Sequence, residues 1–481
     1  MTASDPGASW DDDGAAADPA RFRRSMCVIS FTMGVTLCLP VLPVKIFLMD
    51  RARVQPAQMA FVLSAAYAPR LLKPLFGYCS DLVPICGEHR RPYIVLGIVL
   101  NVVSWSVLAL LGYQSPSLAA IGVALFFEAL TICLADVVVD GVIVERAKRE
   151  AARAAGGLQS TSWMCRSAGA VVGGLVAMVG LDLFEHPLTI IFVTLSTTSI
   201  VSLCNVSTLC DRPGQHRAAA RPSTSSGDLY RFWSNGVLLR STLFVAILSC
   251  HPSPHDAFLY FMRKKLHFST DLVGGLEVAR HAAYFVTAGV FRTWLRQVPI
   301  RRLVQWKLVV QGVLGLGLLL VLFRVVSGVV PDALFIYLDR IVWAACSEIG
   351  FMPVVILAAR LSPDGAEGTV YATFMSLMAL GAIVSQQVSG VMMDLLGVRN
   401  DDFTFLWAMI VICSALHSLP LLFLRLLPDE ADLAPRPKYG SVQMEAAAPG
   451  ADVPDSSAVA IGRTTALDDD GGLDILLPDD D

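Results

Sequence analysis

Charged residues are scarce in this chain of 481 residues. Asp, Glu, Lys and Arg make up only 16% of it, whereas a soluble domain carries about a quarter. Hydrophobic residues reach 54%, and the mean hydropathy is +0.59. A chain of this composition cannot cover a water-facing surface with polar groups. The net charge of -4 also argues against nucleic acid as a partner.

Several functional motifs are missing as well. The eleven cysteines are scattered and form none of the close Cys/Cys or Cys/His pairs that a zinc or redox site needs. There is no Walker A sequence, GxxxxGK[ST], so ATP-driven pumping by this chain is not expected. The first 24 residues hold several aspartates and no apolar core, unlike a secretory signal or a transit peptide. We expect no cofactor and no metal.

Long apolar segments are what the chain has instead. About 20 apolar residues cross a bilayer core about 30 Å thick as a helix. Such segments fall at about 25–48, 58–79, 92–113, 117–141, 157–182, 187–207, 237–261, 271–293, 302–323, 332–358, 369–395 and 403–427. The pattern predicts an all-α polytopic membrane protein with about 12 transmembrane helices in two six-helix bundles.

Polar stretches set the predicted domain boundaries. We expect a disordered N-terminal tail at 1–24, a six-helix bundle at 25–207, a basic linker at 208–236, a second six-helix bundle at 237–428 and a disordered acidic tail at 429–481. The linker is rich in Pro, Ser and Gly, as expected between two bundles. The tail after 428 has too few apolar residues to bury a core.

Basic residues gather in the loops on one side of the predicted bundle. These are Arg21, Arg23, Arg24, Arg90, Arg91, Arg146, Lys148, Arg149, Arg153, Arg212, Arg217, Arg221, Arg296, Arg301, Arg302 and Lys307. Lys and Arg are retained in cytoplasmic loops, so both termini are expected in the cytoplasm. The plasma membrane is favoured over an organellar membrane, because the N-terminus does not resemble a transit peptide.

Three acidic residues lie in or beside the predicted span 117–141, where charge is expensive. An ionisable group near the bilayer centre costs at least about 2.5–3.5 kcal/mol. Asp136 and Asp140 are four residues apart and share one helix face, with Glu128 about a quarter turn away. That face is expected to line a water-filled path. Glu128 lies nearest the midplane, where burial favours an uncharged carboxyl group, and is the candidate for proton coupling.

Basic side chains converge from other predicted spans, namely Arg70, Lys73, Arg166 and Arg340. Lys73 lies near the cytoplasmic end and could simply snorkel to the surface. Arg166 is deeper and needs either a carboxylate partner or an anionic ligand. The two aspartates of 117–141 therefore have two open readings: a brace or gate paired with an arginine, or a substrate contact.

Three further polar groups fall in the second half. Glu277, Arg280 and His281 lie at i, i+3 and i+4, a spacing that favours a self-neutralising cluster. Asp339 and Glu348 are nine residues apart, so only one of them is expected to face a central cavity. The sequence "HPSPHD" at 251–256 breaks its helix, and its prolines favour a hinge more than a metal site.

Several motifs, in order, resemble the folate-biopterin transporter family of the major facilitator superfamily. They read "APRLLKPLFGYCSDLVPICGEHRRPYIVLG", "ADVVVDGVIVERA", "AGGLQSTSWMCRSAGAVVGG", "DAFLYFMRKKLHFS", "PIRRLVQWK" and "LAARLSPDGAEGTVYATFMSLMALG". The match runs from about residue 30 to 428. The resemblance implies the major facilitator fold and proton-coupled uptake or exchange (symport in the first case) of folates, pterins or related small metabolites.

Residues carried over by the resemblance are Lys73, Gly77, Asp81, Arg91, Asp136, Asp140, Gln159, Trp163, Arg166, Glu367 and Ser376. Among these we assign Lys73, Asp81, Arg91, Asp140 and Glu367 to coupling or gating. Arg70 stands where the family usually has Trp, and Ala379 stands where it usually has Asn. Both departures put the identity of the substrate in doubt.

The chemistry of a pterin or folate fits the predicted site. A pterin ring presents an amino group beside a ring N–H, which one carboxylate can accept together, and a glutamate tail suits Arg or Lys. The predicted substrate residues are Glu128, Asp136, Arg166, Trp163, Arg70, Tyr371 and Ser376, with Phe374 as further stacking surface. The alternatives are a transporter of another anionic or amphipathic metabolite, a membrane-embedded enzyme, and a non-transporting sensor.

Overall fold

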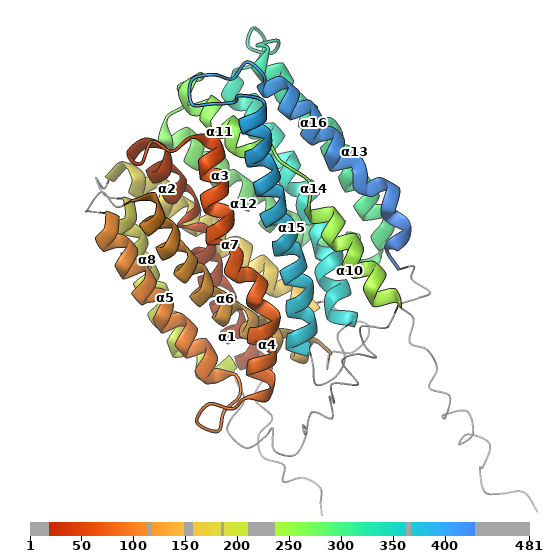
Figure 1. Cartoon of the computed structure of the whole chain (residues 1–481). Coiled ribbons are helices and arrows are strands. Elements are labelled where there is room, and N and C mark those ends of the chain that lie inside the picture. The colour runs from red at the N-terminus through yellow and green to blue at the C-terminus, as the bar shows by residue number, and fades with distance from the viewer. Residues whose placement is uncertain are drawn as a thin grey trace, which may run out of the picture. The chain divides into compact units, whose positions relative to one another are not determined.

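The computed structural model describes residues 19–112, 117–148, 157–183, 187–209, 236–361 and 367–428. The described residues are helical and contain no β-strand; one isolated bridge joins Ile85 and Glu88. The predicted all-α fold is therefore confirmed (Figure 1). The predicted acidic tail at 429–481 and almost all of the predicted linker lie outside the described residues.

The first half contains α1 (Pro19–Cys38), α2 (Val41–Ile46), the π-helical turn η1 (Phe47–Arg51), α3 (Pro56–Ala66), the 3-10 turn η2 (Ala68–Leu72), α4 (Lys73–Leu82), α5 (Arg91–Gly112), α6 (Leu118–Lys148), α7 (Gly157–Leu183) and α8 (Pro187–Leu209). Each apolar segment predicted between 25 and 207 corresponds to one helix or to a run of consecutive helices. α1 begins earlier than predicted, inside the segment for which a disordered tail is expected.

The second half contains α10 (Gly236–Ser249), α11 (His255–Lys264), α12 (Thr270–Thr293), the turn η4 (Leu295–Gln297), α13 (Ile300–Leu322), α14 (Asp332–Leu361), α15 (Glu367–Leu395), α16 (Leu406–Ser418) and the turn η5 (Leu419–Leu426). Its segments also follow the predicted order. We call the side of the bundle at which α1 begins and η5 ends the terminal side, and the other the opposite side.

Among the described residues, nine helices or helix runs are long and apolar enough to cross a membrane. The three other predicted spans are interrupted or charged. Pro69 and Pro74 accompany the change from α3 through η2 to α4, and the prolines of 251–256 separate α10 from α11. A proline removes one backbone donor and clashes with the preceding turn, so a helix bends or stops there. α12 carries Asp271, Glu277 and Arg280 within its length.

Contacts between the two halves are formed mainly by two helices. α7 packs against α12, and α15 packs against α3, α4 and α6. In Figure 1 α15 runs beside α3 and α4, far from them in sequence. The described helices of both halves belong to one compact unit. The residues facing this interface can therefore form a site shared by the halves.

Candidate functional site

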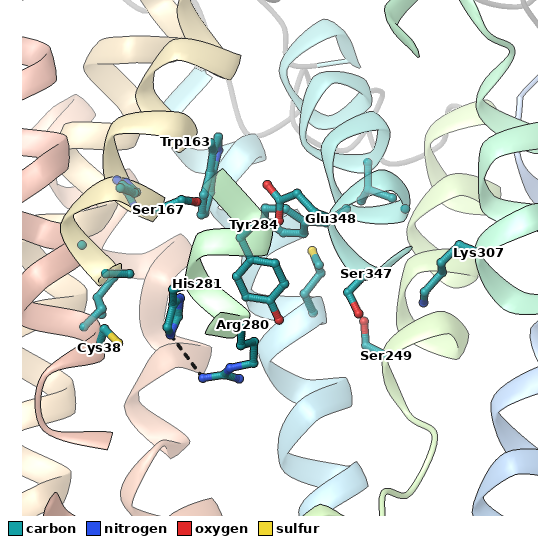
Figure 2. A pocket seen from close by; sticks show the side chains of 18 of the residues that line it. Cys38, Trp163, Ser167, Ser249, Arg280, His281, Tyr284, Lys307, Ser347 and Glu348 are labelled. Carbon is teal, nitrogen blue, oxygen red and sulfur yellow. Dashed lines mark hydrogen bonds between the residues drawn. The ribbon is translucent and has the colours of Figure 1, made fainter. Parts of the chain in front are cut away.

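A cavity of about 450 Å³ lies between helices of the two halves (Figure 2). α1 and α7 supply one wall, and α10, α12, α13 and α14 supply the other. Sites for small molecules commonly enclose about 300–1,000 Å³. The charged and aromatic side chains that line it are Trp163, Arg166, Arg280, His281, Tyr284, Lys307, Glu348 and Phe351, together with His251.

A second cavity of about 320 Å³ adjoins the first one towards the opposite side. The two share the lining residues Val41, His251, Arg280 and Tyr284. The polar lining of the second cavity also includes Lys45, His255, Glu277, Arg340, Gln386 and His417. Polar and ionisable groups therefore continue from the first cavity into the second, inside segments that are otherwise apolar.

Four charged residues of the first half form one buried network. Asp136 accepts a hydrogen bond from Lys73 Nζ at 2.7 Å and another from Arg166 at 2.6 Å. Arg166 also donates to Asp140, at 2.6 Å. The network joins α4, α6 and α7, and each acid is paired with a cation. The structure thus pairs both aspartates with Arg166, which agrees with one of the two readings that sequence analysis left open. The side chain of Lys73 turns inward to Asp136 instead of snorkelling.

Small residues position Arg166 beside this network. A Cβ atom at Gly34 of α1 would overlap the carbonyl oxygen of Arg166, and one at Gly169 would overlap the carbonyl oxygen of Phe31. α1 and α7 therefore touch backbone to backbone, as small residues allow in membrane helices. The guanidinium of Arg166 lies over the ring of Trp163, 4.9 Å from its centroid. Both of these side chains line the larger cavity.

Other predicted substrate residues lie outside both cavity linings. Tyr371 is buried and accepts a hydrogen bond from Gln159 at 2.9 Å, and Phe374 is packed in the same apolar cluster. Ser376 donates to the backbone carbonyl of Arg70 at 3.1 Å. These contacts join α7 and η2 of the first half to α15 near the terminal side. Tyr371 and Phe374 therefore pack the interface between the halves and supply no stacking wall to the described cavities.

Glu128 and Arg70 also lie away from the cavities. Glu128 is buried on α6 beside Asn101 and Trp105 of α5, and it interacts electrostatically with Arg70. The guanidinium of Arg70 lies over the ring of Tyr67, 4.3 Å from its centroid. Of the seven predicted substrate residues, the larger cavity includes only the tryptophan and the arginine of α7.

The loop after α4 contains the remaining predicted gating contacts. Arg90 donates to Asp81 at 3.3 Å and forms an ion pair with Glu145 of α6 at 3.1 Å. Arg91, which sequence analysis preferred, has a side chain that is 47% exposed and pairs with Glu88 at 3.5 Å. Arg90 is therefore the arginine that connects α4 to α6. Glu367 is the first residue of α15, and its side chain lies outside the described residues.

Sequence analysis placed Lys307 in a basic loop, and this is wrong. Lys307 lies within α13 and lines the larger cavity. The neighbouring arginines suggested a loop. They precede α13 or lie in its first turn, whereas Lys307 lies further along the helix. Glu348 lines the same cavity while Asp339 pairs with Arg340 at 3.1 Å, so one of the two acids of α14 faces it, as their spacing predicts.

Sequence analysis missed the ion pairs that join the halves towards the opposite side. Lys45 of α2 pairs with Asp256 of α11 at 2.7 Å, and Asp50 pairs with Arg263 at 3.0 Å. The partners are more than 200 residues apart, so no local spacing could reveal them. Arg280 pairs with Glu277 as predicted, and both line cavities. Among the described residues, no group of three or more His, Cys, Asp or Glu could hold a metal.

The sequence is similar to known transporters over most of its length. The model of the BT1 family matches residues 33–440. The folate-biopterin transporter of Synechocystis sp. is 31% identical over 405 residues, which cover 83% of this chain and 80% of the relative. Folate transporter 1 of Plasmodium falciparum is 22% identical over 409 residues, which cover 85% and 79%.

Solved structures share the fold. The human organic anion transporter MFSD10 matches with a TM-score of 0.58 and 17% identity, over 85% of this chain and all of that one. A D-xylose-proton symporter matches with a TM-score of 0.60 and 13% identity, over 85% and 97%. These likenesses show the major facilitator fold alone. The protein is thus an integral membrane transporter, not an enzyme, and its chain belongs to the BT1 family, the folate-biopterin transporters of the major facilitator superfamily.

Proposed function

We propose that this chain is a secondary active transporter that moves a folate, a pterin or a related small polar metabolite by alternating access. The observation that carries the proposal is the cavity between the halves, whose walls hold buried Arg166 and Glu348 and partly buried Arg280. Ionisable side chains inside membrane segments mark solute and ion pathways, because lipid does not tolerate them. Transporters of this fold bind their solute at the interface of the two halves.

Contacts between the halves on both sides of the cavity support alternating access. On the terminal side, Gln159 contacts Tyr371 at 2.9 Å. Towards the opposite side, Lys45 contacts Asp256 at 2.7 Å, and Tyr260 donates to the carbonyl of Val54 at 2.6 Å. Opening to either side requires one set of contacts to separate while the other set persists. A rocking motion of the two halves would do this without unfolding any helix.

The solute class is supported by the chemistry of the cavity and by the relatives. Trp163, Tyr284 and Phe351 offer aromatic surface of the kind that holds a flat heterocycle. Arginine side chains suit the carboxylates of a glutamate tail, which folates carry and pterins lack. The curated relatives bear the names folate-biopterin transporter and folate transporter. Another anionic or amphipathic metabolite is the competing solute.

Proton coupling is assigned to Glu128. Its carboxyl group is buried between α6 and α5, next to polar Asn101 and close to Arg70. A carboxyl group in such surroundings can exist with or without its proton at modest cost, because burial opposes the charge and the arginine favours it. We further propose that the terminal side faces the cytoplasm of the cell, since its loops and helix ends carry Arg90, Arg301 and Arg302, and that the protein resides in the plasma membrane.

Uptake by purified protein in proteoliposomes tests the function. Labelled folic acid and biopterin should accumulate above the outside concentration when the medium outside is more acidic than the lumen, and a protonophore should abolish the accumulation. A non-transporting sensor would bind the solute without uptake. Equilibration without accumulation would remove the coupling, and absence of both binding and uptake for folic acid and biopterin would remove the proposed solute class.

A further inference from the structure

Three Arg and Lys side chains of the described residues line the cavity, and their charges are compensated differently. Arg166 contacts two aspartates, and Arg280 contacts Glu277. Lys307 lines the same cavity from α13, and no carboxylate of the described residues lies within ion-pair distance of it. A cation held away from bulk water without an anion is costly. Lys307 is therefore the cavity's available positive charge in the described part of the chain.

The position of Lys307 is supported by the neighbouring helix. A Cβ atom at Gly350 of α14 would lie 2.8 Å from Cδ of Lys307 and 3.0 Å from its Cγ. The aliphatic stem of the lysine therefore lies along the backbone of α14, in space that only glycine leaves open. Ser249 and Ser347 are drawn beside Lys307 in Figure 2, and all three line the cavity. Small hydroxyl groups there leave room for a ligand that reaches the ammonium group.

An acidic residue lies in another part of the same cavity. The side chain of Glu348 is buried, and its Oε1 has no hydrogen-bond partner among the residues that the structure describes. Tyr284 interacts electrostatically with Glu348, and Trp163 packs edge to face on Phe351, with ring centroids 4.8 Å apart. In Figure 2 Glu348 lies near Trp163 and Tyr284, whereas Lys307 lies further along the cavity. A buried acceptor beside aromatic rings suits a heterocycle that presents N–H donors.

We propose that Glu348 and Lys307 are the two polar ends of the solute site, and this rests on the proposed function. Glu348 accepts hydrogen bonds from the paired N–H donors of a heterocycle, which lies among Trp163, Tyr284 and Phe351. Lys307 binds a carboxylate carried at the other end of the solute. The site thus takes a flat heterocycle with an anionic tail, and Lys307 decides the preference for a tailed over a tailless solute.

Uptake kinetics of two variants test this assignment. In proteoliposomes, Lys307→Met should raise the KM for folic acid about 10- to 100-fold and change that for biopterin, which has no carboxylate, less than about twofold. Lys307→Arg should recover part of the folic acid KM. Glu348→Gln should raise both values together, because both solutes share the ring. Lys264→Met, which removes an exposed lysine outside the cavities, is the matched control.

A third cavity variant and a binding measurement test the same assignment when a variant transports poorly. Gly350→Ala retains the lysine's charge but moves its stem, so it should raise the KM for folic acid selectively and by less than Lys307→Met. Equilibrium binding to detergent-purified variants gives the same comparison if a variant transports poorly. Equal changes for both solutes in Lys307→Met, or no change, would overturn the assignment while leaving transport intact. If wild-type protein binds and transports neither solute, the proposed function and this assignment both fail.

Discussion

Two groups of buried ionisable side chains, one in each half, are arranged in opposite ways. In the first half, Asp136, Asp140 and Arg166 form a network with Lys73 in which each charge has a partner. In the second half, Lys307 and Glu348 line the cavity without an ion-pair partner among the described residues. A saturated network holds helices together, whereas an unsaturated group can bind something else. The difference suggests that the first half supplies the frame of the site and the second half supplies recognition.

Substituting the aspartate that carries two cations should have the largest effect. Asp136→Asn leaves Lys73 without its partner and Arg166 with one acid, so we expect uptake to fall at least about 100-fold and stability to fall by about 3–5 kcal/mol. Asp140→Asn leaves the arginine paired with Asp136 and should cost less. Uptake and thermal unfolding of both variants check this order. An equal or larger loss in Asp140→Asn would break the account of the network.

Close packing of α1 on α7 should be the next most sensitive feature of the first half. Gly169→Ala places a Cβ atom on the carbonyl of Phe31, so the helices must move apart, at a cost of about 1–3 kcal/mol. Gly289→Ala is the matched control on α12, because the nearest atom that its Cβ atom would meet in the described part of the chain is Met164 Sδ at 4.0 Å. Thermal unfolding in detergent measures both. Equal melting temperatures for the two variants would show that α1 and α7 can move apart without a loss of stability.

Glu128 should affect coupling more than folding. Glu128→Gln keeps the shape of the side chain and removes its titration, so the dependence of uptake on pH should disappear while downhill exchange of solute remains within about threefold of wild type. Counterflow and pH-jump uptake in proteoliposomes separate these two properties. Unchanged pH dependence would assign coupling to another acid, and Glu348 in the second half would then be the first to examine.

Much of the first half, and the order of the helices in both halves, could be predicted from local sequence patterns. Asp136 and Asp140 are four residues apart, which places them on one helix face, and a deep Arg166 then requires an acid. The apolar segments and the prolines at 251–256 likewise gave the order of the helices and the break between α10 and α11. These inferences succeed because a helix repeats every few residues and because a membrane penalises unpaired charge.

The second half shows what local spacing leaves out. Lys307 lies seven residues into α13, and the basic residues before it made it look like part of a loop. The pairing of Lys45 with Asp256 joins residues 211 apart, and it depends on how the two halves dock. Sequence analysis predicted that the rings of Tyr371 and Phe374 would face the solute. The helix face that carries them packs against neighbouring helices instead. The way in which helices dock and rotate about their axes cannot be predicted from the spacing of nearby residues in the sequence.

Protection of a cavity thiol by solute tests the central claim, that the space between the halves is where the solute binds. In a cysteine-free background that still transports, Ser249→Cys places a thiol in the cavity and Lys264→Cys places one on the exposed surface. Folic acid at saturating concentration should slow maleimide labelling of the first at least about tenfold and leave labelling of the second unchanged. Equal labelling rates at Ser249→Cys with and without folic acid, in protein that transports it, would contradict the account.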